Sequence, residues 1–344
     1  MAVNRTRRAR RFLGILAAGS LLGACGSSST PSKDAITVYS GQHPQTTAAL
    51  VAAFEKKTGI AVSVRNADEA VLANQIKVEA SRSPADVFVA GNSPALESVA
   101  SAGLLTQLPG SILSRVPAQY SSPSHSWVGV TARVAVLAYS RSSLGPDELP
   151  ASILDLALPQ WRGKIGLAPS ESDFQPIVAS VERAVGEKRC VAWLKAIKEN
   201  AGSHLYPSNE VLLSALERGE VELGVLEQYY WYRRAAQEGS SAMNTSVATF
   251  NDGDAGYVLA ISGAGVLAAS DNKSAAQRFV AFLVSREGQA IIASSGGFEY
   301  PLADGVTTPA GEPPFDSLHP APTSVADLGD GAGSLRLLQE AQLL

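Results

Sequence analysis

The chain has 344 residues, of which 45% are apolar and 17% are charged. This length allows one large domain or two to three smaller ones, and this composition excludes a globally disordered chain. The formal charge is −4, but five of the 28 basic residues lie before position 25, and without them 23 basic and 32 acidic residues leave a charge of −9. A body this acidic is not expected to bind nucleic acid.

The first predicted element is an export signal. Five arginines precede an apolar run over residues 12–22, which is too short to cross a bilayer. The run ends at Leu22–Cys25, which resembles the lipobox of bacterial lipoproteins, whose Cys is acylated. We predict a signal peptide over residues 1–24, a lipid anchor at Cys25 and a flexible tether over residues 25–34. Such a protein would lie on the outer face of the cell membrane or in the periplasm; ordinary cleavage beside a chance Cys is the alternative, and the export route, Sec or Tat, stays open.

From residue 36 onwards, apolar strands, polar loops and amphipathic helices alternate. The apolar runs predict strands over residues 36–39, 60–64, 86–89, 164–168 and 222–226. The helical patterns cover residues 44–58, start again at 94 and 174, and continue over 209–218, 228–238 and 334–344. This alternation predicts an α/β fold with mostly parallel sheets.

Four polar loops follow predicted strands, at residues 40–43, 90–93, 169–173 and 227–230. In open α/β sheets, ligands bind beyond the carboxyl ends of the strands, so we expect these loops to form a binding site. The sequence has no phosphate-binding loop, no HExxH and no CxxC motif. The segment 91–95 departs from the nucleophile elbow of hydrolases because Ala95 replaces its last Gly. We therefore expect a binding protein and not an enzyme.

The last of these loops opens a run of four aromatic residues at 229–232, YYWY. On a helix they sweep about 300°, so they cannot all face one core. Aromatic packing with exposed tyrosine tips is one interpretation. Two adjacent phenols can also bind a hard trivalent cation such as Fe³⁺, because a phenol with an ordinary pKa near 10 ionises only beside a strong positive charge. Oxygen donors with one imidazole suit Fe³⁺ better than thiolates do, and the four loops hold no Cys.

Six ordered segments resemble the ferric-ion-binding proteins of bacterial ABC importers. They are 39–43 (YSGQH), 85–88 (ADVF), 163–166 (GKIG), 228–232 (QYYWY), 262–267 (SGAGVL) and 299–301 (EYP). The resemblance implies a two-lobed type II periplasmic-binding-protein fold, whose lobes are joined by crossing strands and close on one Fe³⁺. It implies one lobe over residues 35–134 and 258–310, and a second over 135–257 and 311–344.

The resemblance also implies a ligand set and partners. Tyr229 and Tyr230 would be phenolate ligands, and His43 would be the imidazole ligand. The closed protein, expected to be a monomer, would deliver Fe³⁺ to an ABC permease and its ATPase. Typical members have a further Glu ligand at the position where this chain has Gly91, so one coordination position is open or filled by another residue.

A second departure concerns the synergistic anion, a phosphate or carbonate that members commonly bind beside the iron. The corresponding loop here is acidic, with Glu171, Ser172 and Asp173, and Glu227 replaces a frequent Asn. We hypothesise that Glu227, Glu171 or Asp173 replaces the missing carboxylate, the anion, or both; solvated acids are the alternative. Further candidates for anion or cleft contacts are Asn209, Arg133 and Asn92.

Two other functions stay open at this level. The same fold could carry an organic or anionic solute such as a phosphonate or a polyamine, and the acidic loop favours a polyamine in particular. A lipid-anchored hydrolase would need a nucleophile and a base within reach of each other, and no Ser, His and Asp set stands out beyond His43.

Overall fold

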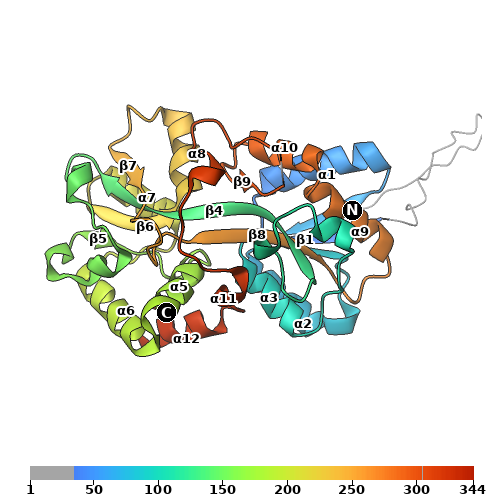
Figure 1. Ribbon diagram of the computed structural model, residues 1–344, viewed down its shortest axis with the longest axis horizontal. Coiled ribbons are helices and arrows are strands. Elements are labelled where there is room, and N and C mark those ends of the chain that lie inside the picture. Colours follow the sequence, from blue (N-terminus) through green and yellow to red (C-terminus); the bar gives the residue numbers. More distant parts are fainter. Residues whose placement is uncertain (1–34, 304) are drawn as a thin grey trace, which may run out of the picture. The chain divides into compact units, whose positions relative to one another are not determined.

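The computed structural model describes residues 35–303 and 305–344, which lie in one compact unit (Figure 1). The predicted signal peptide, the lipobox with Cys25 and the tether up to residue 34 lie outside the described residues. Within the described part of the chain, no helix combines the length and the apolar character that a membrane span requires.

The described strands form one nine-stranded sheet with the order β2-β1-β3-β8-β4-β6-β5, and β7 and β9 also pair with β4. Their bounds are β1 Ile36–Ser40, β2 Val62–Asn66, β3 Val87–Ala90, β4 Trp127–Ser140, β5 Ile165–Gly166, β6 Leu223–Glu227, β7 Thr245–Ala248, β8 Leu259–Val266 and β9 Tyr300–Pro301. All five predicted strands begin within two residues of their predicted starts, but the strand predicted at 164–168 is reduced to two residues.

The pairing of these strands is mixed, and the prediction of mostly parallel sheets is wrong in this respect. Only β1 with β2, β1 with β3, and β5 with β6 pair in parallel. The other pairs involve β4 or β8 and are antiparallel. The reason is connectivity: β4 carries the chain from one half of the body to the other and β8 carries it back, so the two strands run in opposite directions.

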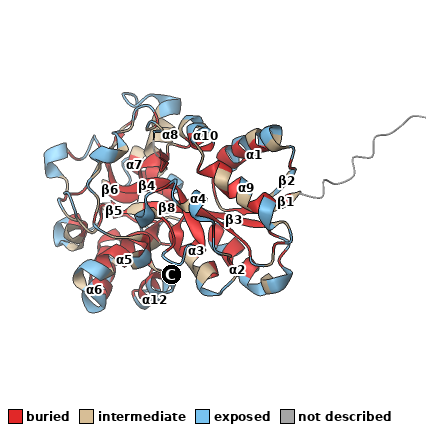
Figure 2. Ribbon diagram, turned by 45° about the vertical axis from the view of Figure 1, so that its right-hand side comes forward, coloured by how far each residue is buried: buried red, intermediate tan, exposed pale blue. Residues whose placement is uncertain are grey.

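The long strand β4 joins the two halves of the sheet (Figure 1). Its first part, Trp127–Val134, pairs with β8, and its second part, Ala135–Tyr139, pairs with β6. All 14 of its residues are buried, and Figure 2 shows the core along this central strand pair. The crossing strands expected from the sequence are therefore present, while the lobe boundaries at 134/135, 257/258 and 310/311 stay a prediction.

Helices cover the sheet on both sides (Figure 1). Their bounds are α1 Pro44–Thr58, α2 Glu69–Glu79, α3 Ser93–Ser101, α4 Gly110–Leu113, α5 Phe174–Val185, α6 Glu187–Ala201, α7 Asn209–Glu217, α8 Gln228–Glu238, α9 Lys273–Leu283, α10 Arg286–Ser294, α11 Val325–Leu328 and α12 Ala332–Glu340. Helix α1 shows how closely local signals set these bounds: Pro44 occupies its first turn, and Gly59 ends it in the left-handed conformation with φ of 72°.

Candidate metal-binding site

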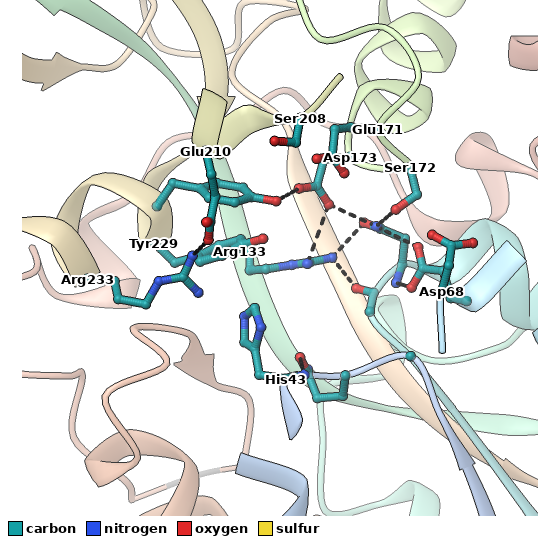
Figure 3. Close-up of a pocket in the computed structure, with 16 residues that line it drawn as sticks. His43, Asp68, Arg133, Glu171, Ser172, Asp173, Ser208, Glu210, Tyr229 and Arg233 are labelled. Atoms are coloured by element: carbon teal, nitrogen blue, oxygen red, sulfur yellow. Dashed lines mark hydrogen bonds and ion pairs between the residues drawn. The ribbon is translucent and has the colours of Figure 1, made fainter. Parts of the chain in front are cut away.

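A cavity of about 390 Å³ opens where the four predicted loops meet (Figure 3). Each loop contributes to its lining: Gln42 and His43 from the first, Gly91 and Asn92 from the second, Glu171, Ser172 and Asp173 from the third, and Tyr229 and Tyr230 from the fourth. The expectation that these loops form a common pocket at the strand ends is therefore confirmed.

The aromatic side of the cavity comes from the first turn of α8. This helix begins directly after β6, so Tyr229 and Tyr230 lie at the carboxyl end of a buried strand. Their rings stack with centroids 4.1 Å apart, and the ring of His43 meets the edge of Tyr229 at 4.9 Å. Tyr232 instead lies against Phe298, at 6.2 Å. The structure thus brings together the two phenols and the imidazole that the sequence singled out.

Burial sets the protonation of these three side chains. It raises the pKa of Tyr229 and Tyr230 above the ordinary value, and the charge of Asp173 adds to the effect. It lowers the pKa of His43, although Glu299 partly opposes this shift. Without a bound cation, the two phenols are protonated and the imidazole is neutral at pH 7. The Nε2 atom of His43 lies 3.5 Å from Oε1 of Glu299 and makes no hydrogen bond to any described residue.

Asp173 lies just before α5 and is the most heavily contacted acid in the cavity. Its Oδ1 accepts a hydrogen bond from Nδ2 of Asn92 at 3.0 Å and lies 3.5 Å from Nη1 of Arg133. Its Oδ2 accepts hydrogen bonds from the hydroxyl of Tyr230 at 3.2 Å and from Nδ2 of Asn209 at 3.3 Å. Only 4% of Asp173 is exposed, so these four groups replace its water shell.

Arg133 projects from the middle of β4 and links this acid to the other half of the site. Its Nη2 donates to Oδ1 of Asn92 at 2.7 Å and to the carbonyl of Gly91, and its Nε lies 3.9 Å from Oε1 of Glu299. Burial alone would lower the pKa of Arg133, but the charges of Asp173 and Glu299 outweigh it and raise the pKa above its ordinary value. The guanidinium therefore stays charged and lies 5.7 Å from the ring centre of Tyr229.

The remaining predicted candidates divide into two groups. Glu171 and Ser172 line the cavity, and Oε1 of Glu171 accepts a hydrogen bond from the backbone N–H of Asn209 at 3.1 Å. Glu227 and Asn209 do not line it. Glu227 is 1% exposed, and its Oε2 has no hydrogen-bond partner among the described residues. Burial, with the charge of Asp173, raises the pKa of Glu227 well above its ordinary value.

Residues 82–324 match the family model described as bacterial extracellular solute-binding protein. The chain belongs to this family. Over 330 residues, covering 96% of each chain, it is 36% identical to the Fe(3+)-binding periplasmic protein of Serratia marcescens. It is also 36% identical over 327 residues to the major ferric iron-binding protein of Neisseria meningitidis, covering 94% of this chain and 97% of that relative.

Solved structures agree with this assignment. The fold matches iron-bound HitA from Pseudomonas aeruginosa with a TM-score of 0.84 and 37% identity, over 89% of this chain and 99% of that one. A Trichodesmium protein in complex with iron and citrate matches with a TM-score of 0.79 and 30% identity, over 89% and 99% of the two chains. The two-lobed α/β fold expected from the sequence is thus confirmed.

Two side chains of this solute-binding protein were missed by sequence reasoning. Glu69, at the start of α2, is 4% exposed, and its two carboxylate oxygens accept hydrogen bonds from the backbone N–H and the Nδ2 of Asn92, each at 2.8 Å. Burial raises its pKa to about 7. Arg233 lies over the rings of Tyr229 and Tyr230, at 5.4 and 5.5 Å from their centres. The helical spacing of i, i+4 from Tyr229 could have found Arg233. Glu69 opens the helix that follows β2, and the loop after this strand was not among the four loops selected from the sequence.

The carboxylate of Glu69 lies beside the backbone of Gly91. A Cβ atom on Gly91 would come within 2.9 Å of Oε2 of Glu69 and 3.5 Å of Nη1 of Arg133. The carboxylate of Glu69 therefore occupies the space into which a side chain at position 91 would extend. The departure from the family pattern at Gly91 is coupled to a carboxylate that arrives from a different element.

The donor set differs from the common acid-and-imidazole metal sites. Among the described residues, no group of three or more His, Cys, Asp and Glu side chains is arranged to hold a metal ion. The candidate set is instead two phenols and one imidazole on one cavity, which are suited to a hard cation of high charge.

Proposed function

We propose that this protein binds one Fe³⁺ ion between its lobes and delivers it to an ABC permease and its ATPase. The observation that carries the proposal is the convergence of two stacked phenols and one neutral imidazole on a single cavity. The names of the relatives from Serratia marcescens and Neisseria meningitidis, which describe ferric-ion binding, support it.

In this proposal, Tyr229, Tyr230 and His43 are the protein ligands. A trivalent cation lowers the pKa of a phenol that contacts it, so binding releases the phenolic protons and makes affinity depend on pH. His43 lies at the start of α1 and the two tyrosines lie on α8, so the donors come from both predicted lobes. Iron then favours the closed form because only that form presents all three donors together.

The cellular setting is part of the same proposal. The relatives with periplasmic names support export, and the predicted lipid anchor at Cys25 would hold the protein, as a monomer, at the outer face of the membrane. Family membership supports capture and release of a solute without chemical conversion, so we propose no enzymatic activity.

A polyamine is the second candidate cargo. The acidic lining residues Asp68, Glu69, Glu171, Asp173 and Glu210 outnumber the two arginines, which favours a cation and disfavours a phosphonate. A polyamine would leave the phenols protonated, so it would produce no colour on binding.

The test is a ferric titration of the metal-free protein. Wild type should develop a visible phenolate-to-iron charge-transfer band, and Tyr229→Phe with Tyr230→Phe should abolish it. Tyr232→Phe is the matched control, because Tyr232 follows on the same helix but does not line the cavity; it should keep the band. A wild type without the band, or a double variant that retains it, would overturn the proposal.

A further inference from the structure

The groups around Asp173 form a cradle of hydrogen-bond donors. In the metal-free protein, Asp173 accepts hydrogen bonds from the amides of Asn92 and Asn209 and from the hydroxyl of Tyr230, and it forms an ion pair with the guanidinium of Arg133. The proton of Tyr230 leaves when the phenolate binds iron, so the cradle that remains is the two amides and the guanidinium. Two amides and a guanidinium around one anionic group are the arrangement expected around a bound oxyanion. Here the anionic group is the side chain of the protein itself.

We propose that Asp173 is a built-in anion that fills this cradle, so that the protein binds Fe³⁺ without phosphate, carbonate or citrate. The inference rests on the proposed function, because it specifies the form in which the cargo is bound. The sequence named Glu227, Glu171 or Asp173 as the residue that replaces the carboxylate ligand, the anion, or both; the proposal assigns the place of the anion to Asp173.

Electrostatics favour this assignment over an exogenous anion. Among the described residues that line the cavity, Arg133 and Arg233 are the only Lys or Arg side chains. Both are already paired: Arg133 with Asp173 and Glu299, and Arg233 with Glu210. An added anion would therefore meet acidic neighbours without an unpaired cation to offset them. Glu171 fits the role less well, because it accepts only the backbone N–H of Asn209.

Glu69 acts as a positioning residue for the cradle. Its carboxylate accepts hydrogen bonds from the backbone N–H and from the side-chain Nδ2 of Asn92. These two bonds hold the Asn92 amide in the orientation in which Nδ2 faces Asp173 and Oδ1 faces Arg133. A Glu at position 91 could not occupy the same space. The glycine at 91, the carboxylate of Glu69 and the carboxylate of Asp173 thus form one connected arrangement.

The experiment measures iron binding with and without an added anion. Metal-free protein in a weakly coordinating chloride buffer is titrated with ferric chloride, alone or with millimolar phosphate or citrate, and affinity is obtained by competition with a chelator. Wild type should develop the charge-transfer band without added anion, and phosphate should change its apparent affinity by less than about threefold. Asp173→Ala should lose about 10–100-fold in affinity without phosphate and regain much of it with phosphate, because the emptied cradle can then hold the free anion.

Glu171→Gln is the matched control, since Glu171 lines the same cavity from the same loop but lies outside the cradle. It should remain independent of phosphate. If wild type develops the band only with phosphate, carbonate or citrate, the built-in anion is refuted while the proposed function stands. If no condition produces the band, the proposed function itself fails. A folded Asp173→Ala protein with wild-type affinity in both buffers would also refute the inference, and should this variant not fold, the wild-type comparison decides alone.

Discussion

The two sides of the cavity are built in different ways. The aromatic side is a single turn of α8 that carries Tyr229, Tyr230 and Arg233. The polar side joins Glu69, Asn92 and Asp173, which come from α2, the loop after β3 and the loop before α5. The two proposed phenolate donors are neighbours in sequence, so one helix is enough to bring them together. The polar residues Glu69, Asn92 and Asp173 meet only when elements that are remote in sequence pack against each other.

Arg133 connects the two sides, and its removal should have the largest effect. Arg133→Met leaves Asp173 and Glu299 buried without their cation, so the free energy of unfolding should fall by about 3–5 kcal/mol. Chemical denaturation of the metal-free protein measures this loss. Arg162→Met removes an exposed ion pair with Glu199 and should cost less than about 1 kcal/mol. Similar losses in both variants would mean that the buried network does not hold the two sides together.

His43 is the one proposed metal donor that α8 does not carry. His43→Ala should weaken ferric binding by about 10–100-fold, while the charge-transfer band persists because both phenolates remain. The affinity is measured by chelator competition, and His125→Ala, at an exposed loop position, is the control. Unchanged affinity in His43→Ala would remove the imidazole from the ligand set and confine the donors to the aromatic side.

The same contrast explains how far the sequence could be interpreted. Strand ends, helix starts and the aromatic run at 229–232 are local signals, so they predicted the four loops and the α/β fold. The resemblance to ferric-ion-binding proteins implied that Tyr229, Tyr230 and His43 meet. Glu69 could not be found, because its role depends on the space left by Gly91, 22 positions later. Glu227 was selected because it replaces an Asn that is frequent in the resembled family, but its side chain is 1% exposed and does not line the cavity. The antiparallel pairing of β4 and β8 was missed because neither strand was among the five predicted from apolar runs, and the resemblance implied crossing strands without their direction.

The coupling between Gly91 and Glu69 can be measured with a double-mutant cycle. Gly91→Glu should lower the free energy of unfolding by about 1–3 kcal/mol, since the new side chain meets the buried carboxylate of Glu69. Adding Glu69→Ala should relieve part of this loss, so that the two effects are not additive. Denaturation of the four proteins gives the coupling energy. Additive losses would show that position 91 and Glu69 are independent, and that the polar side is not one connected unit.

The two sides also differ in how their contribution to stability depends on pH. Behind the aromatic side, Oε1 of Glu312 accepts a hydrogen bond at 3.1 Å from Gln228, the first residue of α8, and burial raises the pKa of Glu312 to about 8, compared with about 7 for Glu69. Both carboxyls bind protons more tightly in the folded state than in the unfolded state. Each therefore stabilises the fold fully below pH 4.5, and this contribution declines by up to about 1.4 kcal/mol per pH unit until the pH reaches the folded pKa.

Denaturation of the metal-free protein between pH 4.5 and 9 separates the two contributions. Glu69→Gln should remove the part of the decline that ends near pH 7, and Glu312→Gln the part that extends to about pH 8. Glu287→Gln, at an exposed ion pair with Lys57, is the control and should leave the profile unchanged. If Glu312→Gln does not flatten the stability profile above pH 7, then the pKa of Glu312 in the folded protein is not raised. In that case, Gln228 donates its hydrogen bond to a charged carboxylate and not to a neutral carboxylic acid.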